Sequence, residues 1–340
     1  MSQWELKQVS PDSPEWTRIL SENKSLLFHQ PVWARVVEEG FNGKACCLIL
    51  EKDGRVTGGM MGFTHRVLWA RFLLFNFPYG GVIGRVPQDG RLAVLLTEFV
   101  RKHRIARVRL VDNPNLDVVP PAGFTVIPNT THMLEINGRQ YDEIWLDYRK
   151  KIRRDVRKAE KSGVTIEEAA DDTGLVTFYS LYLESMSRNQ ALAKYSLKLV
   201  RAIHSLLVPN GTSALFLAYR EGRAIAGILV VDSESISHYL LAGSRTEDLK
   251  YGANDLLISE AIRRAADKGL DYFDFLPSGP DDPALVRFKT KWGAVPFNVH
   301  TLDLVVRPLS TALFNQASRL ANTRPARLLV KAVSGHARSS

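Results

Sequence analysis

One stretch of the chain combines a helical apolar pattern with a dense run of positive charge. From 149 to 161, eight of the thirteen residues are Lys or Arg. In and just before this run, apolar residues recur at i, i+3, i+7, i+11 and i+14, the spacing of one helix face. They are Trp145, Tyr148, Ile152, Val156 and Ala159. The pattern predicts an amphipathic helix, whose charged side fits either a solvated face or a binding surface.

A second pattern occurs twice and is typical of a β-hairpin. Each copy is an apolar run, a tight turn of an acidic residue and Gly, and a second apolar run. The copies read CLILEKDGRVTGGMM at 47–61 and LFLAYREGRAIAGIL at 215–229. Their turn glycines, Gly54 and Gly222, are 168 residues apart, and a second glycine pair keeps the same separation. The repetition predicts two similar domains in one chain.

The segments around the two hairpins also follow the same order. A helical stretch precedes each hairpin, and a helical stretch and then a short strand follow it. Around the first copy these segments are 31–39, 91–104 and 106–111, and around the second they are 173–207, 254–268 and 272–275. The order predicts an α/β (α+β) fold of two tandem domains with mixed, mainly antiparallel sheets.

The Asn137-Gly138 turn marks the boundary between the two predicted domains. We expect a first domain at 1–138, a second at 139–296 that opens with the basic helix, and a basic helical tail at 309–340. The weakly alternating run at 295–306 predicts a closing strand.

The formal charge of the chain is +9, and much of the excess lies at 149–161 and beyond 307. This asymmetry favours an anionic partner: tRNA, a phosphate-bearing precursor or an anionic membrane surface. The first residues contain no apolar signal core, so we expect a cytoplasmic protein, with peripheral contact at the inner face of the membrane as a further hypothesis. The apolar region at 67–83 is too interrupted to span a bilayer.

The residue types also exclude several kinds of site. Cys46 and Cys47 are the only cysteines and have no His or Cys at metal-ligand spacing. We therefore expect packing residues in a reducing compartment, with neither a metal site nor a disulfide. The sequence contains no G-x-S-x-G elbow and no recognisable Cys-His pair. Direct transfer between two bound substrates suits this residue set, because it needs no nucleophile on the protein.

Four segments together resemble the motifs of a known family. FHQPVWAR at 28–35 is similar to F-x-Q-x-x-W-x-K/R, and FPYGG at 77–81 is similar to a P-x-G-G loop. RRDVRKAEKSGV at 153–164 is close to R-x-x-R-K-A-E-K-x-G-V and is the most specific of the four. FDF at 273–275, followed by LVRFKTKWGA at 285–294, resembles a strand and an F-K-x-x-x-G-A segment. The set resembles the FemAB family of peptidyl and aminoacyl transferases and the related FemAB-like acyltransferases.

The resemblance extends from about residue 25 to about 305 and implies two domains of the acyl-CoA N-acetyltransferase (GNAT) type. It implies that a strand at 297–308 returns to complete the first domain. It also implies an acyl donor, aminoacyl-tRNA or acyl-CoA, and no permanently bound cofactor. Two departures stand out: the chain has no long helical insertion like a coiled-coil arm, and Tyr251-Gly252-Ala253-Asn254 keeps only part of the GNAT pyrophosphate loop.

Lys289 and Asp274 are the candidate catalytic residues. On the F-K segment, Lys289 would neutralise the negative charge that develops during acyl transfer or hold the ester of the donor. A surface lysine is the alternative interpretation. Asp274 lies in an apolar strand and points opposite to its neighbours, where it would accept an amine proton or orient Lys289. A structural aspartate is the alternative there.

Two groups of residues are candidates for binding phosphates. Forked guanidinium groups suit phosphate oxygens, which makes Arg153, Arg154 and Arg157 candidate contacts for a donor or an acceptor. Backbone amides at a helix N-terminus bind anions, which makes Gly252, Ala253 and Asn254 candidates for the pyrophosphate of CoA or the 3′ end of tRNA. An ordinary helix-opening turn is the alternative for this second group.

Four further residues are candidates for binding the acceptor. The resemblance implies that Arg35 helps to bind the diphosphate of a nucleotide-linked or lipid-linked muropeptide, and Tyr79 would face the same groove. Trp33 lies in the same motif, and a core aromatic is the stronger alternative there. Tyr239, on a strand after the second hairpin, is expected to border the cleft.

Three functions are consistent with these observations. The first is a FemAB-like transferase that moves an aminoacyl group from tRNA to a peptidoglycan precursor. The second is an acyl-CoA-dependent acetyltransferase that modifies an amino sugar or amine in cell-envelope or exopolysaccharide assembly. The third is a non-enzymatic protein that binds nucleic acid or an anionic surface, which is disfavoured because no aromatic residues alternate with the basic run as stacking platforms.

Overall fold

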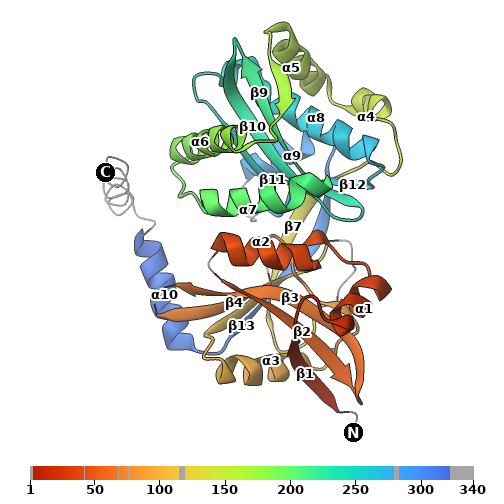
Figure 1. The fold of residues 1–340 in the computed structure, drawn as a ribbon, viewed down its shortest axis with the longest axis vertical. Coiled ribbons are helices and arrows are strands. Elements are labelled where there is room, and N and C mark those ends of the chain that lie inside the picture. Colours follow the sequence, from red (N-terminus) through yellow and green to blue (C-terminus); the bar gives the residue numbers. More distant parts are fainter. Residues whose placement is uncertain are drawn as a thin grey trace.

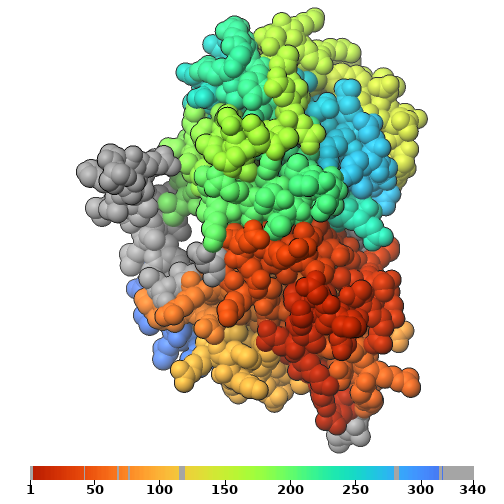
Figure 2. Space-filling view, in the orientation of Figure 1, coloured from red at the N-terminus to blue at the C-terminus, as the bar shows by residue number. Residues whose placement is uncertain are grey.

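The structure is a computed structural model. The N-terminal and C-terminal halves of the chain stack along the long axis of the molecule (Figure 1). It describes residues 3–41, 43–67, 69–75, 77–114, 119–278 and 283–321. Figure 2 shows the two halves in direct contact on the face in view, where the red N-terminal half meets the green segments of the C-terminal half.

The first half alternates helices with strands. Its strands are β1 (Trp4–Val9), β2 (Lys44–Lys52), β3 (Arg55–Val67), β4 (Ala70–Phe75), β5 (Ile83–Gly84), β6 (Arg107–Val111) and β7 (Thr125–Glu135). Its helices are α1 (Pro14–Glu22), α2 (Pro31–Phe41) and α3 (Arg91–Lys102), with a 3-10 turn η1 (Leu27–His29).

The second half contains more helix. Its helices are α4 (Tyr141–Asp147), α5 (Lys150–Lys161), α6 (Asp172–Arg188), α7 (Leu197–Leu207), α8 (Ala253–Asp267), α9 (Pro283–Thr290) and α10 (Pro308–Ala321). Its strands are β8 (Thr165–Glu168), β9 (Ser213–Arg220), β10 (Arg223–Asp232), β11 (Ile236–Ser244), β12 (Tyr272–Asp274) and β13 (Val295–Val305), with 3-10 turns η2 (Val208–Asn210) and η3 (Leu249–Tyr251).

One sheet passes through both halves. Its order is β1-β2-β3-β4-β6-β13-β7-β12-β11-β10-β9-β8, and β5 pairs with β3. Two pairs are parallel, β4 with β6 and β11 with β12, and each is connected by a helix, α3 or α8. The other pairs among the described strands are antiparallel. The prediction of a mixed, mainly antiparallel α/β fold is therefore confirmed.

The two predicted sheets form one sheet because β13 lies between them. It pairs with β6 from Thr301 to Val305 and with β7 from Val295 to Asp303. The Asn137-Gly138 turn follows β7, and both residues have positive φ, 44° and 74°. We keep the domain boundary at this turn as a proposal. Of the predicted tail, 309–321 lies in α10, and 322–340 lies outside the described residues.

The predicted basic helix is interrupted at its start. α4 ends at Asp147, and Tyr148 takes ψ 138° before α5 begins at Lys150. The Tyr148 ring is buried and packs edge-on against Trp292, with centroids 5.2 Å apart, so tertiary packing overrides the helical spacing here. The remaining apolar positions of the stripe, Ile152, Val156 and Ala159, are buried on α5 as predicted.

Three apolar clusters fill the space between the sheet and the helices. α1, α2, α6 and α7 cover one face, and their cluster is shared by both halves. α3 covers the opposite face in the first half, and α4, α5 and α8 cover it in the second. α2 packs directly against α7, so the two halves do not have separate cores on that side (Figure 1).

Two features of the described residues concern membranes and metals. None of their helices has the length and apolar character needed to cross a membrane. Their His, Cys, Asp and Glu side chains do not gather in any group of three that would hold a metal ion.

A buried histidine connects the start of α2 to the FPYGG loop. Nδ1 of His29 accepts the Leu26 amide at 3.1 Å, so Nε2 carries the proton and donates to the Gly81 carbonyl at 3.1 Å. Burial lowers the pKa of His29 from 6.5 to about 4, against a smaller opposing effect of the bond to the Gly81 carbonyl. The folded protein therefore holds this side chain neutral.

His29 predicts an acid-sensitive stability. Between pH 6.5 and 4 the unfolded chain binds a proton at His29 and the folded chain does not, so stability falls as the pH is lowered through this window. A shift of this size corresponds to about 3 kcal/mol. We expect His29→Asn, measured by urea unfolding, to be less stable than wild type at pH 7 but to show a flatter loss of stability from pH 6.5 to 4. Equal slopes for the two proteins would contradict this assignment.

Candidate active site

The parallel pair in the second half opens into a gap. β11 and β12 pair only at Ile236–His238 and Tyr272–Asp274, and β11 then continues to Ser244 without β12 beside it. The rings of Tyr239 and Phe275 lie at the start of this gap, with centroids 6.1 Å apart. Phe288 of α9 packs edge-on against Phe275 at 6.2 Å. Side chains from β11, β12 and α9 thus meet where the strands diverge.

A cavity of about 170 Å³ lies beside Ser244, the last residue of β11. It lies where β10 and β11 approach the N-terminus of α8, and α9 closes its side. Its lining includes Ala226, Ser244, Gly252, Ala253, Asn254, Phe288 and Lys291. The three predicted donor-binding residues, 252–254, are therefore at a cavity rather than in an isolated turn.

The N-terminus of α8 has no side-chain cap, so its first amides depend on other acceptors. Gly252 precedes the helix with φ 75°, and a Cβ there would come within 3.0 Å of the Asp155 carbonyl on α5. Glycine thus allows α5 and α8 to touch at the edge of the cavity. The Asn254 side chain donates to Ser244 Oγ at 3.3 Å and fixes the rim. Such a helix terminus can accept an anion.

Two carboxylates also line this cavity, and each has a cationic partner. Asp255 accepts Lys291 Nζ at 2.7 Å, and Asp248 accepts Arg223 Nη2 at 2.9 Å. These pairs cancel the side-chain charges locally. Attraction for a phosphate must therefore come from the helix terminus and from the neighbouring α5.

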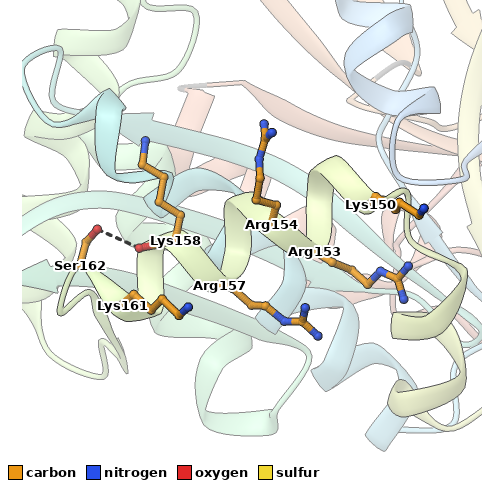
Figure 3. A pocket seen from close by; sticks show the side chains of 7 residues that line it. All are labelled: Lys150, Arg153, Arg154, Arg157, Lys158, Lys161 and Ser162. Carbon is orange, nitrogen blue, oxygen red and sulfur yellow. Dashed lines mark hydrogen bonds between the residues drawn. The ribbon is translucent and has the colours of Figure 1, made fainter.

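The predicted phosphate-binding arginines lie on the exposed face of α5 (Figure 3). They border a shallow hollow of about 610 Å³ with Lys150, Lys158 and Lys161. Arg153 and Arg157 point to one side of the helix, and Arg154 points to the other. Among the described side chains, the ion pair recorded for this face is Arg154 with Asp155 at 3.4 Å. The face is therefore strongly positive, and it lies on the side of α5 opposite to the buried Ile152, Val156 and Ala159.

Lys289 is buried, with 2% of its surface exposed. It lies next to Phe288 on α9, and its Nζ donates to the Leu276 carbonyl just beyond β12. The alternative of a surface lysine is therefore wrong. The ammonium sits beside the strand end from which the gap opens.

Asp274 is fully buried on β12 and does not hydrogen-bond to Lys289 among the described contacts. Its carboxylate accepts hydrogen bonds from Tyr79 at 2.9 Å, from Thr131 at 2.5 Å, from His238 at 2.9 Å and from the Leu276 amide at 2.9 Å. All of these donors belong to the protein. The structure places Asp274 as a sealed carboxylate, and a direct exchange of protons with substrate stays a prediction.

The predicted acceptor residues are divided between core and surface. Trp33 is buried, stacks on Phe77 with centroids 5.4 Å apart, and donates to the Phe77 carbonyl at 3.1 Å. Tyr79 is also buried, and its hydroxyl forms hydrogen bonds with Asp274 and Thr131. Burial raises the pKa of Tyr79 well above its usual range. Arg35 is exposed on α2. The expected open groove in front of Trp33 and Tyr79 is thus filled by packed side chains.

Tyr239 packs against Phe275 where β11 and β12 diverge, and its role in binding substrate stays a prediction; burial is the main cause that raises its pKa. The sequence analysis missed His132, which is buried on β7 with Nδ1 meeting no hydrogen-bond partner among the described residues. Burial lowers the pKa of His132 most, the nearby Lys289 charge lowers it further, and Asp274 opposes them. The stretch THMLE at 131–135 does not alternate and no hairpin pattern marked β7, so neither pattern signalled His132.

A comparison with protein families finds a match in the second half of the chain. Residues 147–290 match the family model described as an acetyltransferase (GNAT) domain. This range contains α5, α8, α9 and the gap between β11 and β12. No curated protein matches the chain.

Three solved structures are similar over most of the chain. FemX is 17% identical with a TM-score of 0.65, covering 91% of this chain and 99% of that chain. A tandem GNAT protein from the clavulanic acid biosynthesis pathway is 11% identical with a TM-score of 0.58, covering 89% and 99%. The C-terminal domain of a putative lysylphosphatidylglycerol synthetase from Agrobacterium fabrum is 13% identical with a TM-score of 0.56, covering 91% and 97%.

At these identities the three structures show the fold alone, which is that of tandem GNAT-like domains. The family match adds a GNAT acetyltransferase domain in the second half, and the protein is an acyltransferase.

Proposed function

We propose that the protein is an N-acyltransferase that moves an aminoacyl or acyl group to an amine of a phosphate-bearing cell-envelope precursor. The observations that carry the proposal are the cavity at the N-terminus of α8, which suits phosphates, and the buried Lys289 of α9. α9 also contributes Phe288 to the lining of that cavity. The resemblance to the FemAB family supports a peptidoglycan peptide or an amino sugar as the acceptor.

In this proposal the two substrates react directly in a ternary complex. A neutral amine attacks the activated carbonyl, and the carbonyl oxygen gains negative charge as the new N–C bond forms. Lys289 stabilises that oxygen, because a positive charge in a buried site interacts strongly. The C–O or C–S bond to the donor then breaks, and the departing oxygen or sulfur leaves with the electron pair.

The attacking nitrogen must lose a proton, and His132 is the candidate acceptor. Its pKa is lowered, so the imidazole is neutral at pH 7 and able to take a proton. It lies close enough to Lys289 for the two charges to interact. Asp274 is a weaker candidate, because four internal donors already occupy its carboxylate.

The donor is the point on which two candidate functions differ. Aminoacyl-tRNA is favoured by the positive face of α5, where six Lys and Arg side chains border one hollow. Acyl-CoA is favoured by the uncapped N-terminus of α8 within the segment that matches a GNAT domain. Stabilisation in a thermal-shift experiment by acetyl-CoA, but not by an aminoacyl-tRNA analogue, would support the acetyltransferase.

The first test concerns Lys289. We expect Lys289→Met to lower kcat by about 10²- to 10³-fold with little change in the KM of the donor, since a group that acts on developing charge is felt mainly in the transition state. Arg287→Met is the matched control, because Arg287 is an exposed residue of the same helix. Steady-state kinetics and a thermal melt of each variant provide the measurement. Full activity of a folded Lys289→Met variant would remove Lys289 from the mechanism.

The second test concerns His132. We expect His132→Gln to lower kcat/KM by about 10²-fold or more at pH 7 and to abolish its acid limb, which in wild type lies below the usual histidine range because the pKa is lowered. The measurement is the pH profile of kcat/KM from pH 4.5 to 9. An unchanged acid limb in the variant would assign the limb to another group.

The third test concerns α5. We expect Arg153→Ala combined with Arg154→Ala to weaken an aminoacyl-tRNA analogue by about tenfold at low salt and to reduce the salt slope by about 2, while acetyl-CoA affinity stays the same. The control, Arg55→Ala combined with Arg101→Ala, removes the same charge from exposed positions in the first half. Equal weakening by both pairs would mean that only the net charge matters and that α5 is a solvated face.

A further inference from the structure

A chain of buried polar groups runs through the centre of the sheet. Ser233 Oγ lies 2.9 Å from His238 Nε2, and His238 Nδ1 lies 2.9 Å from Asp274 Oδ2. All three side chains are at least nine-tenths buried. They come from the end of β10, from β11 and from β12, so the parallel pairing of His238 with Asp274 brings them together.

The partners of this chain fix where its protons are. The Leu27 amide donates to Ser233 Oγ at 3.0 Å, so the Ser233 hydroxyl has its own proton available for His238 Nε2. The other imidazole nitrogen, Nδ1, then carries the proton that it donates to Asp274. Donation to the carboxylate is therefore the role of His238.

Ser233, His238 and Asp274 are connected in the order of a catalytic triad, but Ser233 is not a nucleophile here. Ser233 is 7% exposed, and its oxygen already accepts the Leu27 amide. It lies at the far end of the chain from Lys289. The three groups act as an internal support and not as an acylation site.

Leu276 connects these three groups to Lys289. The Leu276 amide donates to Asp274 Oδ1 at 2.9 Å, and the Leu276 carbonyl accepts Lys289 Nζ. Leu276 has φ 62°, a left-handed conformation that a leucine rarely adopts without other support. Asp274 and Lys289 are thus held by the two polar groups of the same strained residue.

Alternation along β12 shows why this link is needed. Phe273 and Phe275 belong to the cluster under α5 and α8, so Asp274 between them points to the opposite face of the sheet. Trp292, three residues after Lys289, belongs to the same cluster as the two phenylalanines. The Asp274 carboxylate and the Lys289 ammonium are therefore connected by hydrogen bonds to Leu276, just beyond the end of β12.

We propose that His238 is a positioning residue that acts through Asp274 and Leu276 to hold the Lys289 ammonium at the reaction site. His238 fixes the carboxylate, the carboxylate fixes the Leu276 amide, and the Leu276 carbonyl fixes the lysine. The inference rests on the proposed function, because that function has Lys289 stabilise the carbonyl oxygen, and His238 matters only if Lys289 has this role.

Two substitutions of His238 separate positioning from simple packing. The side-chain amide of His238→Asn can place an N–H near the position of Nδ1, so we expect kcat within about threefold of wild type. His238→Leu removes the donor, and we expect kcat to fall about tenfold to 100-fold with the KM of both substrates unchanged. Equal loss in both variants, or a loss confined to KM, would overturn the proposal.

A double-mutant cycle provides the decisive measurement. If His238 acts through Lys289, adding His238→Leu to Lys289→Met lowers kcat no further, whereas a structural defect lowers it in both backgrounds. If His238→Leu does not fold, Tyr79→Phe replaces it in the cycle, since it removes another donor to Asp274 and keeps the ring. A fully active Lys289→Met variant would refute the proposed function itself. A defective Lys289→Met beside a fully active His238→Leu would refute only the inference about His238.

Discussion

The arrangement of the second half depends on burying one carboxylate in the middle of the sheet. An ionised Asp274 without partners would cost several kcal/mol, so the fold must supply donors on every side. They come from β7, from β11, from the turn after β12 and, through Tyr79, from the first half of the chain. The same requirement that satisfies the charge therefore joins the two halves and sets the backbone that receives Lys289.

The charges around the α8 cavity shape the choice of donor. Asp248 and Asp255 face the cavity but are paired, so the pocket itself offers a phosphate little net attraction. The positive potential is on the exposed face of α5, whereas α5 touches Gly252 through Asp155 and Ala159 on its other side. We therefore keep both donors, aminoacyl-tRNA and acyl-CoA, as proposals.

The sequence predicted the elements that depend on local patterns. The repeated hairpins, the crossover helices and the strand before Phe275 lie within a few residues of their expected positions, and the resemblance drew attention to Lys289. The contacts that define the site are non-local. His238 meets Asp274 across 36 residues and Tyr79 meets it across 195, and neither apolar periodicity nor turn chemistry contains that register. Tyr148 shows the reverse case, in which packing against Trp292 broke a helix that spacing predicted.

The two halves share a topology, and the proposed donor site belongs to the second. In the first half, the FPYGG loop occupies the corresponding place beyond β4 and β6. The Gly80 amide donates to the Val111 carbonyl at the end of β6, and a Cβ on Gly80 would come within 2.8 Å of the Phe75 backbone at the end of β4. The chain itself thus fills the first gap, and it places Tyr79 against Asp274 in doing so. A duplicated unit in which the loop of one copy packs against Asp274 of the other is consistent with the proposal of one donor site, in the second half.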